Sequence, residues 1–254
     1  MSDVRLVGGV DAPLARLLIY GSSQRSLQEV FMSVHQESLA LAFSNEVMRE
    51  SLQQRLHGLA HQGAALLLIF LLAIPMLIIA ALVKISCGGQ VLFAHYRVGR
   101  NGDIFRCLKF RSMVVDADQR LEELLASDPE ARAEWAEFRK LRKDPRITPV
   151  GQFLRVTSLD ELPQIFNVLR GEMALVGPRP ITLDEVDRYG RARWLYLQAR
   201  PGVTGLWQVS GRNLTTFEER VELDRTYVNT RTLWLDLEIM LKTVRVILFR
   251  HGAF

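Results

Sequence analysis

Residues 64–83 read AALLLIFLLAIPMLIIAALV and contain neither a charged nor a strongly polar side chain. About 20 consecutive apolar residues are the length that a helix needs to cross the hydrocarbon core of a bilayer. A buried core helix is the alternative, but a helix that is apolar on every side would then need protein packed all around it. We therefore predict a membrane segment, around which the rest of the chain is organised.

A proline interrupts this segment. Pro75 removes one backbone hydrogen bond and kinks a helix, so a straight span and a hairpin that enters and leaves on one face are both consistent with the pattern. Lys84, Arg97 and Arg100 place the C-terminal side in the cytoplasm. The basic residues before the segment are balanced by acidic neighbours, so the pattern leaves the N-terminal side undecided.

The region before the segment has a helical pattern. Between Leu27 and Leu59 no proline occurs, and apolar residues recur at steps of three, four or seven. This predicts an amphipathic helix or helix pair, which could pack on the main domain, pair with a second copy or lie on a membrane. We divide the chain into an N-terminal extension at 1–60, a membrane segment at 61–86 and a globular domain at 87–254.

Composition limits the function without choosing it. The chain has 254 residues, of which 48% are hydrophobic and 24% charged, and this excludes a disordered protein. A formal net charge of +4 permits nucleic acid, anionic lipid or phosphorylated substrates as partners. Cys87 and Cys107 lack metal-ligand spacing and are expected to be reduced structural thiols. The five histidines are scattered, and we assign none of them to a metal.

The globular domain is expected to be α+β and mostly helical. Asn101-Gly102 is the strongest hairpin dipeptide, so strands are expected at 91–93 and 104–110. Helices are expected at 116–126, 129–143, 183–197, 217–228 and 234–249. Arginines beside Trp194, Tyr196 and Trp207 suit a membrane interface or a nucleic-acid surface, and the nearby apolar segment favours the membrane.

The candidate chemistry lies in residues 155–180, RVTSLDELPQIFNVLRGEMALVGPRP. Residues 158–161 fit a capping box, which would place Asp160 in the positive field at a helix start and favour its ionised form. Pro163 is tolerated only in or near a first turn, so a helix that begins a few residues later stays open. An Asp-Glu pair at this position, here Asp160 and Glu161, most often only caps a helix. The pattern alone therefore predicts a candidate anion site and no more.

Cations flank the acidic pair in the sequence. Arg155 precedes it, and Arg179 follows it in a loop stiffened by prolines. Lys109 and Arg111 flank an aromatic residue at the end of the second strand, where a solvated strand end is a commoner role than a phosphate grip. A carboxylate between arginines suits phosphate chemistry, because the arginines hold the anion while the carboxylate attacks or binds metal.

Several motifs in a fixed order resemble the bacterial sugar transferases, monotopic enzymes that transfer a sugar-1-phosphate to a polyprenyl phosphate. The resemblance covers residues 64–254. Its carriers are the proline-broken apolar segment, KFRSM at 109–113, TSLDELPQ at 157–164, GEMALVGPRP at 171–180, RPGVTGLWQVSGRN at 200–213, and the pair Asp224 and Tyr227. Such an ordered set is far more specific than any single motif.

The resemblance implies a mechanism. Asp160 would be the nucleophile that attacks the β-phosphate of a UDP-hexose, with galactose or glucose favoured, and Glu161, the second catalytic residue, would hold Mg²⁺. UMP would leave, and undecaprenyl phosphate would take the hexose-1-phosphate from the aspartyl intermediate as the first membrane step of exopolysaccharide synthesis. Motif residues implied in substrate binding are Lys109, Arg111, Arg155, Arg179, Arg200, Arg212, Asp224 and Tyr227.

The resemblance also implies a fold and a location. We expect a re-entrant membrane helix hairpin carrying a small cytoplasmic catalytic domain with amphipathic interfacial helices and a short β-hairpin. The chain would be monotopic in the bacterial inner membrane, with membrane lipids but no nucleic acid as partners, and with homo-oligomer formation left open. Residues 55–58 match poorly the basic pair and aspartate that the family often has before this helix.

Two other classes of protein stay open at this point. One is a membrane-bound glycosyltransferase that moves the sugar alone and releases UDP. The other is an inactive, membrane-tethered scaffold. The intact acidic pair and its arginines argue against the scaffold, and the identity of the released nucleotide separates the two kinds of enzyme.

Overall fold

The computed structural model describes residue 52 and residues 54–138, 141–211 and 215–249. The chain divides into two compact units, Met1–Leu56 and His57–Phe254, and almost all described residues belong to the second. We describe this second unit by itself. Most of the helical pattern predicted between residues 27 and 59 lies outside the described residues.

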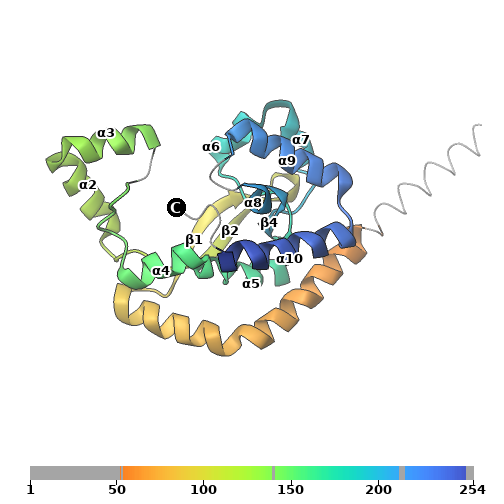
Figure 1. Ribbon diagram of the computed structural model, residues 1–254, viewed down its shortest axis with the longest axis horizontal. Helices are drawn as coiled ribbons and strands as arrows, with labels where there is room; N and C mark the ends of the chain where they lie inside the picture. The colour runs from red at the N-terminus through yellow and green to blue at the C-terminus, as the bar shows by residue number, and fades with distance from the viewer. Residues whose placement is uncertain (1–51, 53, 139–140, 212–214, 250–254) are drawn as a thin grey trace, which may run out of the picture. The chain divides into compact units, whose positions relative to one another are not determined.

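The unit is α+β and mostly helical, as predicted (Figure 1). After the apolar helix, its elements are β1 (Leu92–Val98), η1 (Arg100–Gly102), β2 (Ile104–Phe110), α2 (Ala117–Ser127), α3 (Pro129–Phe138), α4 (Pro149–Thr157), η2 (Leu159–Glu161), α5 (Gln164–Leu169), β3 (Ala174–Val176), α6 (Leu183–Val186), η3 (Asp187–Ala192), α7 (Arg193–Tyr196), β4 (Gly202–Thr204), α8 (Leu206–Ser210), α9 (Phe217–Thr230) and α10 (Leu233–Phe249). Strands β1 and β2 pair antiparallel, and β3 and β4 pair in parallel.

The predicted β-hairpin is confirmed. Asn101 adopts a positive φ of 59° in η1, a left-handed conformation that asparagine tolerates better than most residues. The register pairs Leu92 with Phe110 and Val98 with Ile104. The helices expected at 116–126 and 129–143 are also present, as α2 and α3, although α3 ends at Phe138.

A buried asparagine closes the outer edge of β2. Asn167 from α5 accepts a hydrogen bond at Oδ1 from the backbone N–H of Leu108 at 3.0 Å. Its Nδ2 donates to the backbone oxygen of Arg106 at 2.8 Å. The side-chain amide therefore pairs with β2 as a neighbouring strand would, and it fixes the position of α5 against this strand.

The apolar stretch belongs to one long helix, Gln54–Cys87. Residues on both sides of Pro75 are helical, and the helix curves along the unit in Figure 1. The helix is therefore continuous through Pro75 and is not divided there into two helices. By length and composition the helix could cross a membrane, and only 11% of its most apolar window is buried. A core helix of a soluble protein would be mostly buried.

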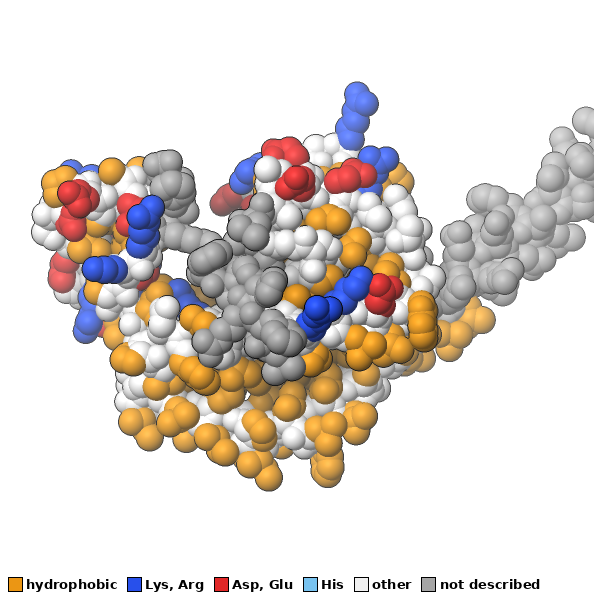
Figure 2. Space-filling model, in the orientation of Figure 1, with side chains coloured by type: hydrophobic (Ala, Val, Ile, Leu, Met, Phe, Trp, Pro, Cys, Tyr) orange, Lys and Arg blue, Asp and Glu red, His pale blue; other side chains and the backbone are white. Residues whose placement is uncertain are grey.

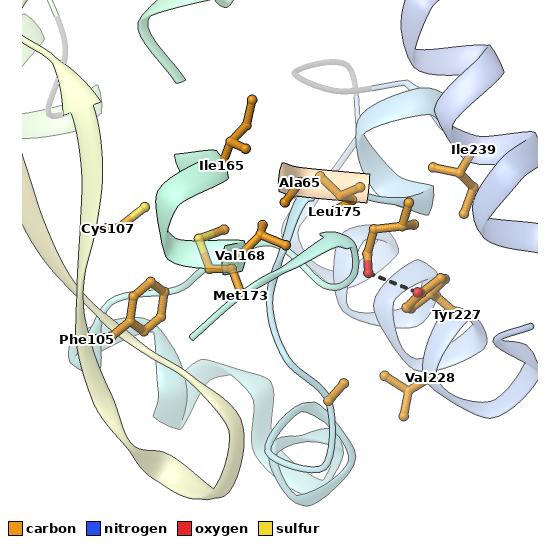
Figure 3. Close-up of a cluster of buried hydrophobic side chains, with 12 residues drawn as sticks. Ala65, Phe105, Cys107, Ile165, Val168, Met173, Leu175, Tyr227, Val228 and Ile239 are labelled. Carbon is orange, nitrogen blue, oxygen red and sulfur yellow. Dashed lines mark hydrogen bonds between the residues drawn. The ribbon is translucent and has the colours of Figure 1, made fainter. Parts of the chain in front are cut away.

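One face of this helix packs on the domain along its length. Ala65 enters the largest buried cluster beside residues of β2, α5, α9 and α10 (Figure 3), while Met76, Ile79 and Val83 enter a second cluster. The other face exposes large apolar side chains, which form the band at the lower edge of Figure 2: Leu66, Leu67, Phe70, Leu71, Ile74, Leu77, Ile78, Leu82 and Ile85. A contiguous apolar surface of this kind marks a membrane or protein contact.

The capping box predicted at residues 158–161 is wrong. Ser158 instead ends α4 in the left-handed conformation, with φ 58°, and makes no side-chain capping hydrogen bond. A regular helix starting at Ser158 would lose the backbone hydrogen bond to Leu159, because Pro163 has no N–H to donate. The chain therefore makes the single turn η2, and α5 begins only after Pro163.

Two further predictions need correction. The helix expected at 183–197 is divided into α6, η3 and α7, because Gly190 has a positive φ of 50° that breaks the helical path. Tyr196 and Trp207 are buried, so they cannot be interfacial residues. Of the three aromatic residues assigned to a membrane interface, Trp194 alone is exposed.

Candidate functional site

The acidic pair lies on η2, between α4 and α5. The left-handed Ser158 turns the chain sharply, so the pair leaves the axis of α4 and faces the end of β2. Asp160 is only 8% exposed, whereas the side chain of Glu161 is 37% exposed. The two neighbouring carboxylates therefore have different environments, one enclosed by protein and one open to water.

Lys109, near the end of β2, lies against both carboxylates. Its Nζ donates to Glu161 Oε1 at 2.6 Å and lies 3.8 Å from Asp160 Oδ2. Arg155, in the last turn of α4, is within electrostatic reach of Asp160, and its Nε donates to Ser112 Oγ at 2.8 Å. The structure thus brings four of the predicted site residues together.

A glycine allows α4 to approach this group. A Cβ atom on Gly151 would lie 2.0 Å from the backbone oxygen of Ser112, a distance at which something must move. Thr148 caps the helix by accepting from the Gly151 N–H at 3.0 Å, and its own N–H donates to Ser112 O at 3.1 Å. Arg155 follows Gly151 by about one helical turn and therefore lies on the same face of α4. The close contact at Gly151 thus also brings the Arg155 guanidinium to Ser112.

Burial raises the pKa of Asp160 to about 6, although the positive charges of Lys109 and Arg155 act to lower it. The prediction that a helix-start field lowers the pKa of Asp160 is therefore wrong. The turn η2 is too short to supply such a field, and desolvation penalises the charged form. The Asp160 carboxyl thus titrates close to neutral pH, as a group that works as a nucleophile or base often does.

A second group of cations lies on Trp207. The guanidinium carbons of Arg179 and Arg220 are 5.1 Å and 4.3 Å from the centre of its ring. The Nε atoms of both arginines are buried and, among the described residues, have no hydrogen-bond partner. Arg97 is close enough that burial and then the charge of Arg179 lower its pKa. Buried guanidinium groups in this arrangement suit a phosphate ligand.

Cys107 lies between the two groups of cations. Its thiol is influenced by Lys109 on β2 and Glu161 on η2, and also by Arg97 and Arg179. Burial raises the pKa of Cys107 to about 11, so the thiol is uncharged. It separates the groups without adding reactivity, as expected of a structural cysteine. Both cysteines of the chain are free and buried.

Asp224 and Tyr227, from α9, are each 2% exposed. Asp224 Oδ2 accepts a hydrogen bond from the Tyr189 hydroxyl at 2.9 Å, and burial raises its pKa to about 7. The charge of Arg179 acts on the same carboxyl, so Asp224 belongs beside the second group of cations. The hydroxyl of Tyr227 instead lies 3.0 Å from the backbone oxygen of Val176, the contact dashed in Figure 3.

Two other predicted residues, Arg111 and Arg200, are not brought to the acidic pair. Arg111 Nε donates to the backbone oxygen of Gln90 at 2.8 Å, and the side chain lines a pocket of about 420 Å³ on the β-hairpin. Arg200 lies close to Gly58 on the long helix and to Gly171. Arg212 lies outside the described residues.

Arg97 and Arg220 were missed by reasoning from the sequence. Arg97 lies near the end of strand β1, and Arg220 is one of several charged residues on α9. Neither local pattern distinguishes them from solvent-facing arginines. Their burial beside Arg179 becomes visible only when α9 packs against the loop that carries Arg179.

Comparisons with known proteins give one family and several relatives. The family model described as bacterial sugar transferase matches residues 52–250. The chain is 47% identical over 233 residues to an undecaprenyl-phosphate galactose phosphotransferase of Salmonella typhimurium, covering 88% of this chain and 48% of that protein. It is 49% identical over 218 residues to a UDP-galactose-lipid carrier transferase of Erwinia amylovora, covering 86% of this chain and 45% of that protein.

A third relative is shorter. The exopolysaccharide production protein ExoY of Rhizobium meliloti is 49% identical over 178 residues, which cover 70% of this chain and 79% of that protein. The chain spans about half the length of the Salmonella and Erwinia proteins. The prediction that the resemblance starts at residue 64 is wrong, because the family match begins twelve residues earlier, at residue 52.

Proposed function

Because this chain belongs to the bacterial sugar transferase family, we propose that it transfers a hexose-1-phosphate from a UDP-hexose to undecaprenyl phosphate and releases UMP. The observation that carries the proposal is the buried Asp160, held 3.8 Å from Lys109 with its pKa near 6. Galactose is the favoured sugar because two of the relatives are named for it, and glucose is the alternative. The transfer would be the first membrane step of exopolysaccharide synthesis.

In the first step, an oxygen of Asp160 attacks the β-phosphorus of the UDP-hexose. The bond from this phosphorus to the oxygen that bridges the two phosphates breaks, and UMP leaves with the electron pair. A carboxylate is a weak nucleophile, so most of the rate must come from positioning and from cations that neutralise the phosphates. We assign this task to Lys109 beside the β-phosphate, with Arg155 next to it.

In the second step, a phosphate oxygen of undecaprenyl phosphate attacks the same phosphorus. The bond to Asp160 breaks, and the free carboxylate and an undecaprenyl diphospho-hexose are formed.

We assign Arg179 and Arg220 to the phosphates of the nucleotide, because the buried Nε atoms of these guanidinium groups lack partners among the described residues. Two displacements at one phosphorus give a ping-pong cycle, in which UMP is released before the lipid reacts.

The family implies Mg²⁺ as a cofactor, and the acidic pair fits this ion. Mg²⁺ is usually bound by one or two carboxylates, with water and substrate phosphates completing its shell. Glu161 offers a carboxylate that is open to water, next to the buried carboxylate of Asp160. We therefore propose Glu161 as the protein ligand. When bound, the ion neutralises part of the charge on the substrate phosphates.

The long helix is proposed to enter and leave the bacterial inner membrane on its cytoplasmic side. Near one end, Gln62 Nε2 donates to the backbone oxygen of Leu169 at 3.0 Å. Near the other end, Ser86 Oγ lies 3.5 Å from Thr148 Oγ1. A straight span would separate one of these ends from the domain by the thickness of the bilayer. A monotopic helix immersed by its exposed face keeps both contacts and places the acidic pair close to the lipid substrate.

Product analysis tests the proposal. Membranes that contain the protein are incubated with undecaprenyl phosphate and a panel of UDP-hexoses, and the released nucleotide is identified. We expect UMP in a one-to-one ratio with the lipid product, and UDP-galactose as the best donor. Release of UDP would indicate a glycosyltransferase instead. Absence of turnover with every donor, in membranes where the related Salmonella protein is active, would support the scaffold.

The pH dependence of the first step follows from the pKa of Asp160. UMP release with donor alone is expected to fall about tenfold for each pH unit below about 6, since only the ionised carboxylate attacks phosphorus. In Lys109→Met the inflection should move to higher pH, because the cation that lowers the pKa of Asp160 is lost. A rate independent of pH between about 5 and 7, or an inflection displaced to lower pH in the variant, would contradict this assignment.

A further inference from the structure

Three side chains of metal-ligand type converge near the start of the long helix. His57 and His61 are one helical turn apart on this helix, and Asp236 lies in the first turn of α10. The Nε2 atoms of His57 and His61 are 2.7 Å and 3.1 Å from the same oxygen, Asp236 Oδ2. All three ligand atoms lie within 4.8 Å of one another.

Each imidazole nitrogen is close enough to form an ion pair with Asp236 Oδ2, but both nitrogens share this one oxygen. Both Nε2 atoms and Asp236 Oδ2 are buried, and none of them has a hydrogen-bond partner of acceptable geometry among the described residues. Buried polar atoms nearly always have a hydrogen-bond partner, so this group of three buried ligand atoms needs an explanation. An ion between the three atoms would accept a lone pair from each of them, and all three lie within 4.8 Å of one another.

The carboxylate of Asp236 is held in place by a second contact. The hydroxyl of Tyr227 lies 2.7 Å from its other oxygen, Oδ1, so that Oδ2 is left facing the two imidazoles. Asp236 is 2% exposed, and its helix is capped by Thr232, whose Oγ1 accepts from the Leu235 N–H at 3.1 Å. Partners of this kind, which orient a ligand from behind, are typical of metal sites.

We propose that His57, His61 and Asp236 bind one divalent transition-metal ion, and Zn²⁺ is the ion that we expect. Two imidazole nitrogens and one carboxylate oxygen are the donor set of three-ligand zinc sites and of non-haem iron sites. Mg²⁺ is disfavoured because it selects oxygen ligands. The side chain of His57 is 25% exposed, so it is the most accessible of the three ligands.

This site is independent of the proposed transfer reaction. None of its three residues is among the described partners of Asp160 or Glu161. The metal would join the start of the long helix to α10, two segments that are 179 residues apart between His57 and Asp236. Its role is therefore to fix the apolar helix on the domain at the point where the helix approaches the membrane.

Metal binding to the purified full-length protein tests the inference. The protein is prepared in detergent with an affinity tag free of histidine, stripped with a chelator, and titrated with Zn²⁺ by calorimetry. We expect one equivalent to bind and the melting temperature to rise with Zn²⁺ concentration until the site is saturated. His61→Ala and Asp236→Asn should weaken binding by about 100-fold or more, and Tyr227→Phe by about 10- to 100-fold.

Two further variants keep the test decisive. His57→Ala removes the most exposed ligand, so it serves if the buried variants fail to fold. His95→Ala is the matched control, because His95 is exposed on β1, where its Nδ1 lies 2.9 Å from the backbone oxygen of Tyr96 and its ring lies near that of Phe93. If the wild-type protein binds Zn²⁺ no more tightly than His57→Ala does, the two histidines contact Asp236 directly and hold no metal. Equal loss in His95→Ala would place the metal elsewhere, and either result overturns the inference.

Discussion

Asp160→Asn is expected to lower turnover by roughly 10⁴-fold or more, because an amide cannot displace UMP from phosphorus. The substitution should leave the fold intact. Burial already penalises the charged form of Asp160 and raises its pKa to about 6, so a neutral side chain of the same shape fits the pocket. Turnover and the melting temperature are measured on the same membrane preparation, which separates loss of chemistry from loss of structure.

The same variant identifies the nucleophile directly. Incubation with a UDP-hexose labelled at the β-phosphate, without lipid acceptor, should label the wild-type protein at residue 160 and leave Asp160→Asn unlabelled. Asp184→Asn is the matched control, since this acidic residue lies in the first turn of α6 and is exposed. Product formation without label at residue 160, or turnover retained by Asp160→Ala, would disprove the covalent mechanism while leaving the family assignment in place.

Leu71→Glu combined with Ile74→Glu is expected to release the protein from membranes. Both side chains are on the exposed apolar face of the long helix. A charged residue in the hydrocarbon region costs about 2.5–3.5 kcal/mol, so two of them should reduce partitioning by roughly 10³- to 10⁵-fold. Flotation of vesicles with bound protein measures the effect, and circular dichroism checks that the variant is folded.

Leu183→Glu is the matched control for this experiment. Leu183 is 60% exposed, but it begins α6, which lies far from the long helix in Figure 1. The control should stay on membranes. If the double variant also remained bound after an alkaline wash, the exposed face of the helix would not be the membrane contact, and the monotopic arrangement would be disproved.

Much of the local structure could be predicted because it depends on neighbours in the chain. The Asn101-Gly102 turn sets the β-hairpin, and the continuous apolar run of residues 64–83 sets the long helix. The motif order also carried the family, which the match over residues 52–250 confirms. Two predictions of helix ends failed, at Ser158 and at Gly190, because a single backbone conformation there decides whether a helix starts or stops.

The site could be predicted only in part, since its residues come from distant segments. The signal at residues 155–180 located Asp160 and its motif, but it gave the wrong direction for the effect on the pKa of this carboxyl. That pKa depends on burial by β2 and α4, which no local pattern records. The four-residue spacing of His57 and His61 was visible in the sequence, yet it gained meaning only beside Asp236.

The sequence by itself determined the apolar helix, the β-hairpin, the family and the identity of the acidic pair, since each depends on residue types at short spacing. The tertiary structure alone decided that Asp160 is enclosed beside Lys109, that Arg179 and Arg220 share one tryptophan, and that two histidines meet Asp236. The physical reason is common to all three. Desolvation and charge pairing act between atoms that are close in space, and packing brings those atoms together from remote parts of the chain.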